Sequence, residues 1–145
     1  MQLYIRDAVG TDLPAIGAIL RDNGLDGSGD ALRREALAEI DRTDGSYVLV
    51  AEYDSQIVAA LHLVVFRRLD AAAGKTAQIT LLAVANGFRT SGVHEKLIDH
   101  AAGRASDIGC RELLAFVGTS DADEHPRWER AGFVHLQRGY VRRTD

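Results

Sequence analysis

Apolar and polar residues follow two different spacings along the chain, and these spacings predict both helices and strands. Apolar residues recur every three or four positions at 13–20 and 93–108, as on one face of a helix. A further helix is predicted at 30–40, with apolar positions Leu32, Ala36, Leu37 and Ile40, and a short one around 127–131. Segments rich in apolar and β-branched residues predict strands at 2–6, 46–53, 56–66, 77–84, 112–117 and 133–141.

Turn residues mark where these elements begin and end. Thr11 or Asp12 is suited to begin the first helix, and Asp54-Ser55 predicts a hairpin between two strands. Asn86-Gly87 ends the strand 77–84, and Gly109 ends the helix that follows. The order β-α-α-β-β-β-α-β-α-β predicts a mixed sheet with helices on its faces. No repeat or linker divides residues 1–145, so a single domain is expected.

Composition narrows the class of protein without identifying it. The chain has 46% hydrophobic and 26% charged residues, which is ordinary for a soluble globular domain. The apolar run IVAALHLVVF is too short to span a membrane, and the N-terminal residues show no secretory signal. A single cysteine, Cys110, excludes an internal disulfide and fits a reducing compartment. We therefore expect a cytoplasmic protein without a membrane partner.

The charge distribution argues against a nucleic-acid partner but leaves a local anion site open. The formal net charge is −4, from 17 basic and 21 acidic residues. From His125 to Asp145, however, there are five arginines: Arg127, Arg130, Arg138, Arg142 and Arg143. This segment is interpreted either as a solvated face or as a surface that attracts an anion.

Three short motifs suggest chemistry that their sequence context does not support. AAAGKT, at 71–76, ends like a phosphate-binding P-loop, but Leu69 stands where its first glycine is required and a strand is predicted after the lysine. HEKLIDH places His94 and His100 about 120° apart on a helix, which indicates surface histidines rather than zinc ligands. Cys110 has no base nearby in the sequence and is interpreted as a structural thiol.

The segment FRTSGVHEKL, at 88–97, has the composition of an anion-binding loop. It lies between a predicted strand and a predicted helix, where the first backbone N–H groups have no helical partner and the helix dipole is positive. Gly92 allows the backbone to approach an anion closely, and Arg89 can add a charge-assisted contact. An ordinary strand-to-helix turn remains the alternative interpretation.

With this loop in place, the chain resembles the GNAT family of N-acetyltransferases over nearly its whole length. The loop pattern of that family is arginine or glutamine, two residues, glycine, one residue, then glycine or alanine, and 89–94 matches its first and fourth positions. Further segments resemble the family in order: YIRDAVGTDLPAI, VAEYDSQIVAALHL, the apolar strand ending at Val84, and WERAGF. The resemblance implies a GNAT-type three-layer α/β/α sandwich with a mixed, mostly antiparallel sheet.

The resemblance further implies that the protein binds acetyl-CoA and transfers its acetyl group to an amine of a small molecule or peptide, by direct attack in a ternary complex. It places the pyrophosphate over the backbone of Arg89, Thr90, Ser91, Gly92, Val93 and His94, and the pantetheine arm along Leu82, Ala83 and Val84. No metal is required. A homodimer is left open, because many members of the family form one.

His94 departs from the family pattern, which has a small residue at the sixth loop position. Three interpretations are open. The side chain obstructs the phosphate, turns outward, or contacts a phosphate as an imidazolium.

Two positions near the C-terminal end also depart from the pattern. Trp128 stands where the family often has a tyrosine that reprotonates the thiolate, and an indole cannot supply that proton. Tyr140 is a substitute only if the last strand brings it near the thiol. Asp121 stands where an asparagine commonly binds the pantetheine arm. Ser120 can donate in its place, and Asp121 is also suited to cap a helix.

No general base is predicted. Glu52 ends a strand beside the expected site but is interpreted as a solvated hairpin carboxylate, and His62 as a hydrogen-bonded core histidine. Catalytic residues and the acceptor therefore stay unassigned. The alternative function is a catalytically silent GNAT-fold module for regulation or interaction, with weak or no CoA binding. A third hypothesis is an anion-binding domain that uses the arginine-rich segment.

Overall fold

The sheet of this protein has five strands in chain order. The computed structural model describes residues 2–25, 29–70, 74–116, 124–135 and 142–144. Its strands are β1 (Tyr4–Asp7), β2 (Ser46–Tyr53), β3 (Gln56–Arg67), β4 (Lys75–Val84) and β5 (Cys110–Ala115). Neighbours from β1 to β4 are antiparallel, whereas β5 is parallel to β4. The predicted mixed, mostly antiparallel sheet is confirmed.

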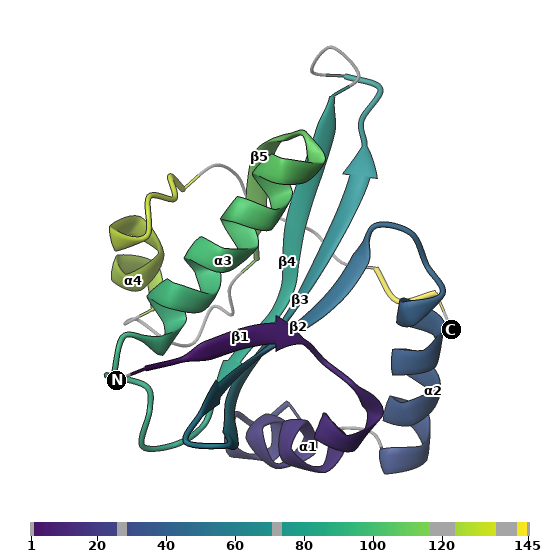
Figure 1. Cartoon of the computed structure of the whole chain (residues 1–145). Helices are drawn as coiled ribbons and strands as arrows, with labels where there is room; N and C mark the ends of the chain where they lie inside the picture. Colours follow the sequence, from purple (N-terminus) through teal and green to yellow (C-terminus); the bar gives the residue numbers. More distant parts are fainter. Residues whose placement is uncertain (1, 26–28, 71–73, 117–123, 136–141, 145) are drawn as a thin grey trace.

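Helices cover both faces of this sheet (Figure 1). They are the 3-10 turn η1 (Gly10–Asp12) and the α-helices α1 (Leu13–Asp22), α2 (Asp30–Asp41), α3 (Val93–Ile108) and α4 (Glu124–Arg130). Helices α1 and α2 pack on one face through Leu13, Ile16 and Leu37. Helix α3 packs on the other through Val93, Leu97, Ala101 and Ala105. The expected three-layer α/β/α sandwich is confirmed. None of the described helices is long and apolar enough to cross a membrane.

Two predictions about individual elements need correction. Leu32 does not lie on the buried face of α2 but is 60% exposed, because α2 contacts the sheet chiefly through Leu37. The predicted closing strand at 133–141 is not seen at 133–135, and its remaining residues lie outside the described part. The Asp54-Ser55 hairpin is confirmed, since both residues adopt positive φ (51° and 63°), as a tight two-residue hairpin turn requires.

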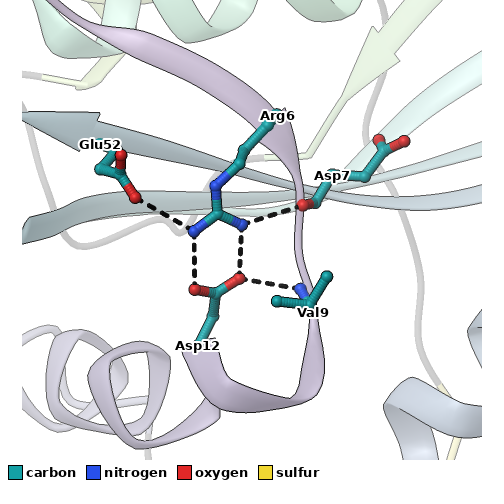
Figure 2. Close-up of polar contacts among 5 residues, drawn as sticks. All are labelled: Arg6, Asp7, Val9, Asp12 and Glu52. Atoms are coloured by element: carbon teal, nitrogen blue, oxygen red, sulfur yellow. Dashed lines mark hydrogen bonds and ion pairs between the residues drawn. The ribbon is translucent and has the colours of Figure 1, made fainter. Parts of the chain in front are cut away.

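A partly buried ion pair connects the N-terminal strand to the sheet and to the first helix (Figure 2). Two nitrogens of Arg6 donate to the two carboxylate oxygens of Asp12, at 2.7 and 2.9 Å, and one of them also reaches Glu52, at 3.2 Å. Asp12 accepts a further bond from the Val9 backbone N–H at 2.8 Å. Asp12 thus lies at the start of the helix, as predicted. Its carboxylate accepts from the backbone of Val9, before the η1 turn, and makes no capping hydrogen bond to α1.

Candidate functional site

Within the described residues, the edge of β4 that faces β5 is open beyond the point where β5 leaves it. The last pair between the two strands is Ile79 with Ala115, and β4 continues to Val84 with β3 on one side and no described strand on the other. The Ala85 N–H donates to the Val58 carbonyl of β3 at 2.8 Å. Because backbone groups alternate in direction along a strand, those of Leu82 and Val84 point away from β3, toward the open edge. The predicted segment 82–84 therefore presents backbone groups for pairing.

A β-bulge lies at the start of this open edge. On β3, His62 pairs with Leu81 and Leu63 with Ile79, so Thr80 has no residue opposite it. The Thr80 hydroxyl donates to the His62 carbonyl at 3.4 Å. Bulges bend a strand and redirect its groups, and they are common beside functional sites.

The loop after β4 leads directly into the N-terminus of α3, as predicted. Gly92 begins the helix with φ of 86°, a left-handed conformation that favours glycine. The first helical hydrogen bond runs from the Lys96 N–H to the Gly92 carbonyl. The N–H groups of Val93 and His94 have no acceptor among the described residues. The space over Gly92 is also open, so the arrangement can hold an anion.

The side chain of Arg89 makes its hydrogen bonds to the end of α1. Its Nη2 donates to the Asp22 carbonyl at 3.1 Å and to Asn23 Oδ1 at 3.2 Å, both at the end of α1. Its Nε and Nη1 have no partner among the described residues. The guanidinium is therefore held at one corner and keeps donors for an anion.

His94 is neither turned outward nor on the surface, which corrects both predictions. Its side chain is buried, and its Nε2 accepts a hydrogen bond from Arg127 of α4 at 3.2 Å. Its Nδ1 is buried without a partner in the described part of the chain. Burial, followed by the nearby Arg127 charge, lowers the pKa of His94 to about 4. The ring is neutral at pH 7, so the imidazolium hypothesis does not hold for the free protein.

The two side chains considered as bases have structural partners. Glu52 binds Arg6, as described above, so it is not simply a solvated hairpin carboxylate. His62 is half-buried, and its Nε2 lies 2.8 Å from the Ser46 hydroxyl. Burial lowers the pKa of His62, which leaves it neutral at pH 7. The predicted hydrogen bond of His62 is confirmed, whereas its predicted place in the core is not, because the ring is half-buried.

Other predicted positions have packing roles or lie outside the described residues. Trp128 packs edge-on against Phe133, with ring centroids 4.9 Å apart. Cys110 is half-buried, and burial raises the pKa of its thiol, in agreement with a structural role. A strand follows the GKT sequence, because Lys75 begins β4. Ser120, Asp121 and Tyr140 lie outside the described residues. No cluster of three metal-ligating side chains occurs within the described ranges.

Two residues at this site were missed by sequence reasoning. Asn23 was not singled out from the sequence, and Arg127 was interpreted only as part of a basic segment. Their partners, Arg89 and His94, lie 66 and 33 positions away along the chain. No local pattern reports contacts of that separation.

Comparison with known proteins gives the same assignment over most of the chain. Residues 14–133 match the model of the acetyltransferase (GNAT) family. Among solved structures, a transcriptional regulator from Bacillus halodurans C-125 is 21% identical, with a TM-score of 0.91 over 99% of this chain and 100% of that chain. Glucosamine-6-phosphate N-acetyltransferase from Arabidopsis thaliana is 17% identical, with a TM-score of 0.86 over 100% of both chains.

A third structure similar to this chain contains the coenzyme. Aminoglycoside N-acetyltransferase AAC(6')-Iy in complex with CoA is 19% identical, with a TM-score of 0.85 over 99% of this chain and 95% of that chain. At these identities the structures show a shared fold. No curated protein matches the sequence.

Proposed function

Because the chain belongs to the GNAT family of acetyltransferases, we propose that it transfers the acetyl group of acetyl-CoA to an amine of a small molecule or peptide, by direct attack in a ternary complex. One observation carries this proposal. The backbone groups of Leu82 and Val84 that point away from β3 are followed, after a short loop, by the start of α3. The first N–H groups of that helix have no acceptor among the described residues. An extended amide-containing arm that ends in a pyrophosphate matches both features at once.

The coenzyme would be held mainly by backbone. Its pyrophosphate lies over 89–94, where the N–H groups of Val93 and His94 donate to it together with Arg89. Its pantetheine arm pairs with 82–84 as an added strand. Ser120 remains a proposed donor to that arm. These contacts fix the thioester beside β4, where an outward amide near Val84 polarises its carbonyl.

The transfer needs a neutral amine and a fixed position for both reactants. The amine nitrogen attacks the thioester carbonyl carbon, the C–S bond breaks, and CoA leaves as a thiolate that takes up a proton. The proton lost by the amine passes to water or to a base outside β4, because β4 carries no carboxylate. Holding both reactants together supplies a large part of the rate. We place this reaction in the cytoplasm.

Calorimetric titration with acetyl-CoA tests the proposal, followed by a screen of amines for release of free CoA thiol. We expect micromolar binding and thiol release with at least one class of amine. The proposal fails if saturating acetyl-CoA gives no heat and no protection against thermal unfolding.

The alternative function, a catalytically silent module, is favoured by one observation. The His94 ring, held by Arg127, stands at the second residue of α3, where the family pattern has glycine or alanine. The same titration on His94→Gly separates the two functions. If only the variant binds acetyl-CoA, His94 obstructs the site and the silent module becomes the better description. If the natural protein and His94→Gly bind acetyl-CoA equally, His94 does not obstruct the site.

A further inference from the structure

The side chain of Asn23 connects three segments at the edge of the coenzyme site. Its Nδ2 donates to the Ile19 carbonyl within α1 at 2.8 Å and to the Val84 carbonyl on β4 at 3.1 Å. Its Oδ1 accepts from Arg89 of the anion-binding loop at 3.2 Å. Both amide hydrogens and the amide oxygen are therefore used, and this set of partners permits only one orientation of the amide.

The Val84 contact limits how the open edge can pair. The Val84 carbonyl points away from β3, and Asn23 already occupies it from outside the sheet. The N–H of Val84 and both backbone groups of Leu82 point the same way and have no partner among the described residues. An arm laid along this edge can therefore pair with those groups, and its pairing stops where Asn23 lies.

The Arg89 contact determines where that guanidinium lies. Asn23 and the Asp22 carbonyl together hold Nη2, while Nε and Nη1 have no partner in the described part of the chain. An exposed arginine otherwise samples many rotamers, and the loss of these rotamers when a ligand binds costs conformational entropy and weakens affinity. A guanidinium held in advance loses fewer of them, and its Nε and Nη1 remain available as donors.

We propose that Asn23 is a positioning residue for the coenzyme: it orients Arg89 toward the pyrophosphate and sets the end of the backbone pairing at Val84. This inference rests on the proposed function, because it assigns a role at the same site. Asn23 itself need not touch the coenzyme. Its effect on binding of the pyrophosphate is exerted through Arg89, and that dependence can be measured.

A double-mutant cycle on coenzyme A binding tests the inference. Dissociation constants are measured by calorimetry for the natural protein, Asn23→Ala, Arg89→Ala and the double variant. We expect Asn23→Ala to weaken binding by roughly fivefold, the effect of leaving one long side chain unheld. In the Arg89→Ala background, the same substitution should change binding by less than about twofold. Asn86→Ala is the matched control, because Asn86 is an exposed amide of the neighbouring turn, and it should bind like the natural protein.

A purely structural role for Asn23 predicts a different pattern. Asn23→Ala would then weaken binding by the same factor with and without Arg89, and that result overturns the inference. It is also overturned if Asn23→Ala binds like the natural protein, or if Arg89→Ala has no effect. If Asn23→Ala does not fold, Asn23→Ser is used, because serine can still bind the Ile19 carbonyl but is too short to reach Arg89. If the natural protein does not bind coenzyme A, the proposed function fails and this inference fails with it.

Discussion

At the scale of single residues, Asp12 and His94 both have lowered pKa values, for opposite reasons. The Arg6 guanidinium stabilises the charged form of Asp12, whereas burial destabilises the charged form of His94. For each residue, the unfolded state binds more protons than the folded state at pH values between its folded and its unfolded pKa. The free energy of unfolding therefore rises with pH in that window. The windows differ. That of His94 lies between about 4 and 6.5, and that of Asp12 lies below its ordinary value of about 3.9.

His94→Gln should reduce the pH dependence of stability between pH 6.5 and 4, a window to which the lowered pKa of His62 also contributes. The natural protein should lose about 1–2 kcal/mol through His94 across this window, less than the full pKa shift corresponds to, because surrounding groups relax around a charged ring. The free energy of unfolding in urea, measured at several pH values, checks this. His100→Gln, on an exposed position of the same helix, should leave the pH dependence in place. An unchanged slope in His94→Gln would contradict a buried, neutral ring.

Asp12→Asn should lower the free energy of unfolding by about 1–2 kcal/mol at pH 7, because a partly buried charge-assisted pair is broken. The difference from the natural protein should shrink below about pH 4, where Asp12 becomes protonated in the unfolded chain. Urea unfolding at pH 7 and pH 3 measures both values. As a control, Asp70→Asn removes an exposed partner of Arg68 and should have little effect. Equal effects of the two substitutions would show that the network in Figure 2 is not important for stability.

At the scale of elements, sequence periodicity predicted most helices and strands within a few residues. Spacing and turn residues are local properties, and β2 and α3 begin and end close to where those signals stand. The parting of β4 and β5, the inward direction of His94 and the contacts of Asn23 depend on segments brought together by packing. Those features were outside what a local pattern can report. The loop into α3, with Gly92 at positive φ, was predicted because one short segment carries its turn residues.

Glycine substitutions in α3 should have opposite effects at its start and in its middle. Gly92→Ala should destabilise the protein by about 1 kcal/mol, because alanine resists a positive φ even though space for a methyl group is open. Gly103→Ala should stabilise it by about 0.5–1 kcal/mol, since Gly103 lies inside the helix with open space around it. Thermal unfolding of both variants checks this. The same sign for both would contradict the assigned start of α3.

At the scale of the whole molecule, the proposed coenzyme would add a link between β4 and α3, which already pack together in the core. It would pair with β4 and cap α3 near the point where His94 contacts Arg127 of α4. A ligand that binds only the folded state stabilises it by about 2.7 kcal/mol at one hundred times its dissociation constant. For a chain of this size, the unfolding temperature should then rise by about 5–10 °C. Differential scanning fluorimetry with acetyl-CoA measures the rise. ADP, which lacks the pantetheine arm, should give a much smaller one.

The open edge of β4 also has a consequence for the protein without its coenzyme. Backbone groups that can pair with an extended arm can equally recruit a strand from another molecule, which is how sheet edges begin aggregation. Among the residues that the structure describes, Asn23 covers the Val84 carbonyl and leaves the other outward groups of 82–84 without a partner. We therefore expect concentrated protein to scatter more light when coenzyme A is absent than when the site is saturated. Bound coenzyme would then protect this edge from association with other molecules. The solubility of the protein would therefore measure how much of the site is occupied, before any reaction is measured.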